Sequence, residues 1–75
     1  MGNLKAKLII LNFVSTYRAE AGISKQALAE EIGVTRATIN SIEKGNYNPS
    51  LELAFRLSLF FKTDINELFH LEDQQ

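Results

Sequence analysis

The sequence contains no cysteine, a single proline and four glycines. Without cysteine the chain cannot form a disulfide or a cysteine-ligated metal site. Seventy-five residues predict one domain, and a chain of this size buries only about 60% of the surface that its unfolded form exposes. Its stability must therefore come from packing, from oligomerisation or from both.

Long hydrophobic runs are absent as well. The longest apolar stretches are residues 8–11 and 57–61, and Ser58 interrupts the second. A membrane span needs roughly 18 apolar residues. The polar side chains of Asn12 and Arg18 also make the N-terminal region too polar for the core of a signal peptide. The sequence therefore predicts a cytoplasmic protein with no membrane partner.

An excess of positive charge is the third absence. Eight lysines and arginines stand against nine acidic residues, which gives a net charge of −1 and a pI near 5.7. This balance argues against a nucleic-acid partner, because binding to phosphates needs clustered positive charge. The objection holds only if the cations are scattered, since acidic side chains can occupy the opposite face.

The residues needed for catalysis are equally sparse. His70 is the single histidine and has no second metal ligand or nucleophile beside it in the sequence. Glu30 and Glu31 are adjacent, and on a helix adjacent side chains point about 100° apart, so they are expected to be solvated. The sequence predicts no enzyme activity, no cofactor and no metal site.

Helical periodicity is what the sequence has in abundance. No segment alternates with a period of two, and no Asn-Gly or Asp-Gly hairpin turn occurs. The predicted fold class is all-α, a compact five-helix domain over residues 1–75, with fraying at the first few residues and at 72–75. Four predicted helices cover residues 6–21, 25–32, 36–44 and 51–61, and a short fifth begins at Asp64. Gly22 and Gly33 are expected to end the first two helices.

Ser24, Thr35 and Ser50 are expected to cap the second, third and fourth helices. Asp64 and Glu67 have the spacing of a capping box at the start of the fifth. The predicted core of the fourth helix comprises Leu51, Ala54, Phe55 and residues 57–60. Leu68 and Phe69 are the expected apolar residues of the fifth.

More apolar residues are present than so small a core should need. The first helix is apolar over most of its circumference, through Leu8, Ile9, Ile10, Leu11, Phe13, Val14 and Tyr17. Phe60, Phe61 and Phe69 cluster in the last third of the chain. Such surplus predicts a subunit contact. The expected dimer surface uses the fifth helix and the end of the fourth, with the first helix as the alternative.

The predicted second and third helices have the spacing of a helix-turn-helix, with its core at residues 24–44. Ala29 is small where the two helices should cross, and Gly33 can adopt the positive φ of a sharp reversal. Val34 is expected to fill the gap between the helices, while Ile39 and Ile42 anchor the third helix. This arrangement leaves a face without acidic residues, made of Arg36, Ala37, Asn40, Ser41 and Lys44.

These residues carry a resemblance to a known family. The segment GISKQALAEEIGVTRATINSIEKG, residues 22–45, resembles the lambda-repressor-like (Cro/xenobiotic-response-element) helix-turn-helix regulators. The following segment NYNPSLELA, residues 46–54, resembles the short bacterial members. The match covers roughly residues 15–69. It implies a five-helix domain whose third helix lies in the DNA major groove.

The resemblance also implies roles for individual residues. The residues expected to face bases are Thr35, Arg36, Ala37, Asn40 and Ser41. The residues expected to contact phosphates are Lys25, Gln26, Lys44, Asn46 and Tyr47. In relatives, an arginine near the end of the first helix pairs with a glutamate at the end of the third, which predicts an Arg18–Glu43 ion pair here.

Two positions depart from the family pattern. Lys25 stands where a glutamine is common, which should strengthen the contact with the DNA backbone and raise its salt dependence. Ala37 stands where a base-reading glutamine is frequent, and alanine can only pack against a thymine methyl group. Specificity is therefore expected to depend on Arg36 and Asn40.

The function predicted from these observations is sequence-specific binding to double-stranded DNA. The protein would be a transcriptional regulator, in particular a repressor, that binds a palindromic operator as a homodimer. The alternative is an antitoxin-like or anti-repressor module that keeps the fold but binds another protein through exposed apolar residues.

Overall fold

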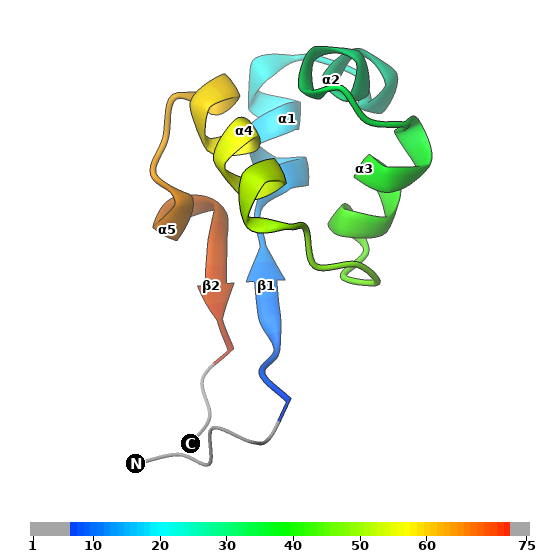
Figure 1. Cartoon of the computed structure of the whole chain (residues 1–75). Helices are drawn as coiled ribbons and strands as arrows, with labels where there is room; N and C mark the ends of the chain where they lie inside the picture. The colour runs from blue at the N-terminus through cyan, green and yellow to red at the C-terminus, as the bar shows by residue number, and fades with distance from the viewer. Residues whose placement is uncertain (1–6, 73–75) are drawn as a thin grey trace.

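The computed structural model describes residues 7–72, which form five helices and two short strands (Figure 1). In chain order the elements are β1 (Ile10–Asn12), α1 (Val14–Ala21), α2 (Lys25–Ile32), α3 (Arg36–Glu43), α4 (Leu51–Phe61), α5 (Ile65–Leu68) and β2 (Phe69–Leu71). The helices pack together, and the β1–β2 ribbon projects from them on one side. None of the helices in this part of the chain is long and apolar enough to cross a membrane.

The two strands correct the all-α prediction. β1 pairs antiparallel with β2, with Ile10 opposite Leu71 and Asn12 opposite Phe69. The pairing continues at both ends, since Phe13 N donates to Leu68 O at 2.8 Å and Glu72 N donates to Ile9 O at 2.9 Å. Each strand has only three residues, and no local turn joins them. A search for alternation or a hairpin turn therefore could not find them.

The strands also move the boundaries of two predicted helices. The first helix begins at Val14 and not near residue 6, because the β-branched Ile9 and Ile10 lead into the ladder. The fifth ends at Leu68, so Phe69 belongs to β2 and not to α5. Glu72 is bonded to Ile9 and is not frayed. Residues 1–6 and 73–75, also predicted to fray, lie outside the described residues.

The core gathers side chains from each of the five helices. Val14, Leu28, Ile39 and Leu57 are fully buried, as is Leu68. Ala29, Ile32, Ile42 and Leu53 complete this cluster. The core residues Ile39 and Ile42 therefore anchor one face of α3, and the opposite face of this helix is exposed to solvent.

The apolar face of α4 is rotated from its predicted position. Leu53, Ala54 and Leu57 are buried, whereas Leu51, Phe55 and Leu59 are 71%, 51% and 76% exposed. The prediction had placed Leu51, Phe55 and Leu59 in the core. Because α4 is apolar on nearly every side, its periodicity did not define a unique buried face.

The phenylalanines of the last third of the chain, some of which were expected at a dimer contact, contribute to the core. Phe60, Phe61 and Phe69 are partly buried and pack against the core. Phe61 contacts Tyr17, with ring centroids 5.8 Å apart. The exposed apolar surface is formed instead by α4 and by the ribbon, where Leu8, Ile9, Leu11, Phe13 and Leu71 are exposed.

The helix caps follow the sequence rules at most positions. The side chains of Ser24, Thr35 and Ser50 accept hydrogen bonds from backbone N–H groups in the first turns of α2, α3 and α4. Gly22 ends α1 in the left-handed conformation, at φ 71°. Asp64 precedes α5, but its side chain makes no capping hydrogen bond, so the capping box is not formed.

Candidate nucleic-acid interface

The turn between α2 and α3 is built from three residues that the sequence had singled out. Gly33 has φ 88°, and its N–H and that of Val34 both donate to Ala29 O, at 2.8 and 3.0 Å. A β-carbon at Gly33 would be strained by this φ and would also lie 3.4 Å from Arg56 Nη1. Ala29 is fully buried, and Val34 packs against the core. The turn therefore fixes the position of α3 relative to α2.

One face of α3 is available to a ligand. Ile39 and Ile42 are 0% and 1% exposed and turn the opposite face outward. We call this outward face the recognition face; it consists of Arg36, Ala37, Asn40, Ser41 and Lys44. Arg36, Ala37 and Lys44 are exposed, and Asn40 and Ser41 are half-buried. The face carries no acidic side chain.

Thr35 lies at the start of this face but already has partners. Its hydroxyl accepts from Thr38 N at 3.2 Å and lies 3.0 Å from Thr38 Oγ1. Thr35 therefore caps α3, as the sequence predicted.

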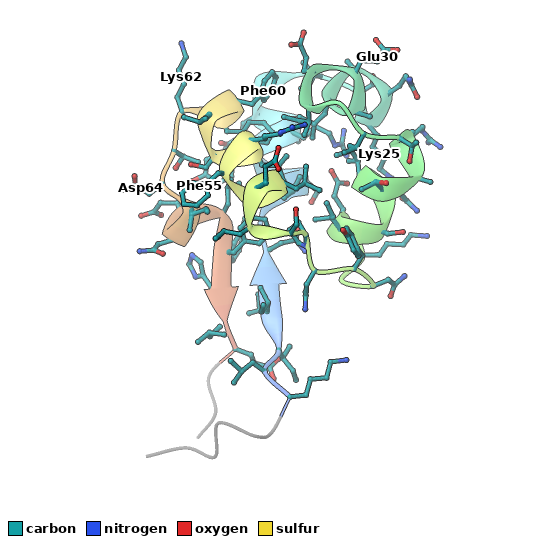
Figure 2. The ribbon with its side chains drawn as sticks, in the orientation of Figure 1. Lys25, Glu30, Phe55, Phe60, Lys62 and Asp64 are labelled. Carbon is teal, nitrogen blue, oxygen red and sulfur yellow. The ribbon has the colours of Figure 1, made fainter. Side chains whose placement is uncertain are left out.

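The two residues at the start of α2 are also engaged within the protein. Lys25 Nζ donates to Asn40 Oδ1 at 2.8 Å, across the angle between α2 and α3. Gln26 Nε2 donates to Glu30 Oε2 at 3.0 Å on the surface of α2. Figure 2 shows Lys25 between α2 and α3, and Glu30 at the far side of α2. Lys25 therefore borders the recognition face, whereas Gln26 is bonded along α2.

The segment after α3 is tied to the end of that helix. Lys44 N donates to Asn40 O at 3.0 Å, and Asn46 N donates to Ser41 O at 2.9 Å. Asn46 and Tyr47 follow as exposed residues, with Tyr47 44% exposed. These bonds hold the polar groups of the loop beside the C-terminal end of the recognition face.

The Arg18–Glu43 ion pair is present beneath this surface. Arg18 Nε and Nη2 donate to the two carboxylate oxygens of Glu43 at 2.8 and 3.2 Å, and Nη1 donates to Ile23 O at 3.0 Å. The side chains are 19% and 7% exposed. The hydrogen bond to Glu43 raises the pKa of Arg18 above its usual range. The pair links α1, the segment before α2 and the end of α3, and it neutralises Glu43, the one acidic residue of α3.

A second support of α3 was missed at the sequence level. Asn12 Nδ2 donates to Ile42 O at 2.8 Å, and Asn12 Oδ1 accepts from Val14 N at 3.2 Å. Its side chain thus satisfies a carbonyl at the end of α3 and an N–H at the start of α1. An asparagine before a helix is a capping signal, but the predicted first helix ran through this position.

The charges at the helix starts are unusual for helices and favourable for an anion. Lys25 and Arg36 occupy the first positions of α2 and α3, where neither helix has an acidic residue in its first turn. The N-terminal end of a helix carries partial positive charge, so a cation there is unfavourable for the helix. By contrast, α4 has Glu52 in its first turn. Lys25 and Arg36 thus each add a cation at a helix N-terminal end, where an anion is favoured.

Comparisons with known proteins point to the same part of the chain. The model of a helix-turn-helix family matches residues 14–68. An uncharacterised HTH-type transcriptional regulator of Methanocaldococcus jannaschii is 44% identical over 64 residues, which cover 85% of this chain and 97% of that protein. The uncharacterised HTH-type transcriptional regulator YgzD of Bacillus subtilis is 43% identical over 63 residues, 84% and 96% of the two chains. Relatives thus occur in archaea as well as in bacteria.

Solved structures share the fold. The restriction-modification controller protein C.AhdI of Aeromonas hydrophila superposes with a TM-score of 0.67 at 26% identity, over 72% of this chain and 78% of that one. A protein of Bacteroides fragilis superposes with a TM-score of 0.74 at 24% identity, over 81% and 98%. The turn geometry, the buried and exposed faces of α3 and these matches agree. The chain belongs to the lambda-repressor-like helix-turn-helix family.

Proposed function

We propose that the protein is a transcriptional repressor that binds a palindromic operator in double-stranded DNA as a homodimer. The relatives named above are HTH-type transcriptional regulators, which supports DNA binding and regulation of transcription. Such a regulator acts where the DNA is, which in bacteria and archaea is the cytoplasm. A bound repressor needs only to occupy the operator.

The observation that carries the proposal is the recognition face of α3. It has no acidic side chain, it is bordered by Lys25, and Glu43, the one acidic residue of α3, is neutralised by Arg18. In a helix-turn-helix, the second helix of the motif, here α3, lies in the major groove with its first residues against base edges. The net charge of −1 is a weaker objection, because Arg36 and Lys44 lie at the two ends of α3 and Lys25 contacts Asn40.

We assign the contacts as follows. Residues proposed to face bases are Thr35, Arg36, Ala37, Asn40 and Ser41. Residues proposed to contact phosphates are Lys25, Gln26, Lys44, Asn46 and Tyr47. Arg36 is the best suited to read a base, because its guanidinium can donate two hydrogen bonds to guanine O6 and N7. Gln26 must exchange its bond with Glu30 for one with a phosphate.

Dimerisation is proposed on energetic grounds. One domain with few cations makes few phosphate contacts, so its affinity for DNA should be low. Two copies double the contacts and can place two recognition helices about 34 Å apart, one turn of B-DNA. The exposed residues Leu51, Phe55 and Leu59, called here the apolar stripe of α4, supply surface for such a contact. In Figure 2, Phe55 lies on α4, on the side of the view away from Lys25.

Selection of bound sequences from a random duplex pool tests the proposal. The expected result is an enriched palindrome whose half-sites are separated by about one helical turn. Absence of enrichment at low salt would contradict DNA binding. Enrichment of a single, asymmetric half-site would retain DNA binding and remove the dimer.

The same apolar stripe also favours the second candidate, a protein-interaction module on this fold. That function predicts binding to a protein partner that persists when both Arg36 and Lys44 are changed to alanine. Under the DNA-binding proposal, the double variant loses its measurable activity.

A further inference from the structure

We infer that Lys25 sets the base preference of Asn40 by fixing the orientation of its carboxamide, so that Asn40 selects a G·C pair over an A·T pair. The inference rests on the proposed DNA-binding function and deepens it. It gives Lys25 a second role beside its proposed phosphate contact, as a positioning residue for specificity.

The contact between the two side chains decides the orientation of the amide. Lys25 Nζ lies 2.8 Å from Asn40 Oδ1. An ammonium group has three donors and no acceptor, so the atom of Asn40 that faces it must be the oxygen. The amide nitrogen of Asn40 then points away from Lys25. Within the described residues, Asn40 Nδ2 has no hydrogen-bond partner, so both of its N–H groups remain for a ligand.

The chemistry of base recognition turns this orientation into a preference. Asparagine binds adenine by two bonds, in which Oδ1 accepts from the amino group N6 and Nδ2 donates to N7. With Lys25 bonded to Oδ1, the positive charge repels the donor edge of the amino group. Oδ1 keeps a second lone pair, but the ammonium charge beside it disfavours the approach of another N–H donor. The groups that the Lys25–Asn40 pair offers a base are therefore mainly donors, from the remaining ammonium N–H groups and from Nδ2. Guanine offers two neighbouring acceptors in the major groove, O6 and N7, which match this set.

The stability of α2 does not account for a lysine at this position. A cation at the first position of α2 opposes the helix dipole, and no acidic residue lies in that turn to offset it. Lys25 and Asn40 are both half-buried, at the angle where α2 meets α3. The contact therefore lies at the edge of the recognition face, next to the amide whose orientation it fixes.

The test compares sequence preferences of the wild type with those of Lys25→Met, Asn40→Ala and Lys44→Met in the same duplex selection. The base pair read by Asn40 is the one whose preference disappears in Asn40→Ala. We expect the wild type to favour G·C there by about tenfold. Lys25→Met should shift that position toward A·T. Lys44→Met removes an equal charge. It should weaken binding to all sequences evenly and leave the base preference at that position unchanged.

Each other outcome is decisive. Uniform weakening in Lys25→Met with an unchanged preference overturns the inference and leaves the proposed function standing. A wild-type preference for A·T at that position, or no affected position in Asn40→Ala, overturns it as well. If the wild type enriches no sequence, both the proposed function and the inference fail.

A second measurement needs no DNA. The side-chain amide signals of Asn40 in a ¹⁵N correlation spectrum, assigned by their loss in Asn40→Ala, should shift in Lys25→Met and stay in place in Lys44→Met. Signals that do not move in Lys25→Met would show that the contact is absent in solution. A thermal melt of each variant confirms that the fold is retained.

Discussion

At the scale of single residues, the most informative backbone conformation is that of Lys62, which ends α4 at φ 55° and ψ 44°. Among the described residues it is the only one other than glycine with a positive φ. A side chain in this region costs about 1–2 kcal/mol, because the β-carbon crowds the following carbonyl oxygen.

Replacing Lys62 by glycine should therefore stabilise the protein. Glycine removes the steric conflict but loses more backbone entropy on folding, so we expect a net gain of about 0.5–1 kcal/mol in the free energy of unfolding. Urea unfolding measures it. Lys62→Ala is the control, since it removes the charge and keeps the β-carbon. An equal gain in Lys62→Ala would assign the effect to charge and not to backbone strain.

The Arg18–Glu43 pair supports a second prediction at this scale. Arg18→Met leaves the carboxylate of Glu43, 7% exposed, without its partner, and it also removes the bond to Ile23 O. We expect a loss of about 2–3 kcal/mol in the free energy of unfolding, below the range for fully buried pairs because Arg18 is partly solvated. The double variant Arg18→Met/Glu43→Gln should lose less than Arg18→Met alone. A loss in Arg18→Met below about 0.5 kcal/mol would place the pair among ordinary surface ion pairs.

Residue-scale features were the most predictable from sequence. The caps at Ser24 and Thr35 and the positive φ of Gly33 follow from local chemistry, which needs no knowledge of the rest of the fold. The Lys25–Asn40 bond was not predictable in the same way. It depends on how a long side chain crosses between two packed helices, and the sequence specifies the residue but not its rotamer.

At the scale of elements, the cations at the first positions of α2 and α3 are expected to lower the stability of these helices and to favour binding to DNA. Arg36→Glu places a negative charge at the positive end of α3 and should raise the free energy of unfolding by about 0.3–1 kcal/mol. The same change should weaken DNA binding by at least about tenfold, because it removes the proposed base contact and repels phosphates. Thermal melts and binding titrations measure the two effects.

Arg36→Gln provides the neutral comparison for this prediction. It should fall between the wild type and Arg36→Glu in both stability and affinity. A variant series in which stability and affinity fall together would indicate that Arg36 supports the fold and not the interface.

Helices and strands were harder to predict than single residues in two cases. In one the apolar periodicity was ambiguous, and in the other the pairing partners lie far apart in the sequence. The buried face of α4 was misplaced because Leu51, Phe55 and Leu59 compete with Leu53 and Leu57 for the same periodicity. The strands were missed because Ile10–Asn12 pairs with Phe69–Leu71 from the other end of the described chain. Such pairing is decided by tertiary packing, which short windows of sequence do not contain.

At the scale of the whole molecule, the exposed apolar surface predicts self-association. Leu59 is 76% exposed and lies on the apolar stripe of α4. Leu59→Lys should leave the melting temperature almost unchanged, because little burial is lost, and should convert a concentration-dependent dimer into a monomer. Sedimentation measures the oligomeric state. Affinity for a full palindrome should fall, and affinity for a half-site should not.

Ala19→Lys separates this surface from the alternative on α1. Ala19 is exposed, and most of the large apolar side chains expected on the first helix lie instead on and around β1, whereas Val14 and Tyr17 remain on α1. We expect Ala19→Lys to remain dimeric. Dissociation by Ala19→Lys and not by Leu59→Lys would assign the contact to α1.

The side chain of Asn12 has a consequence for local opening of the molecule. It links the last residue of β1 to the carbonyl of Ile42, so the ribbon and the end of α3 share a hydrogen bond. The ladder contains few bonds and many of its apolar side chains are exposed, so the ribbon is expected to open before the helical core. When it opens, Asn12 withdraws from Ile42. We therefore expect hydrogen exchange in the C-terminal turn of α3 to be faster when Asn12 is replaced by alanine, because one bond to the end of that helix is then missing.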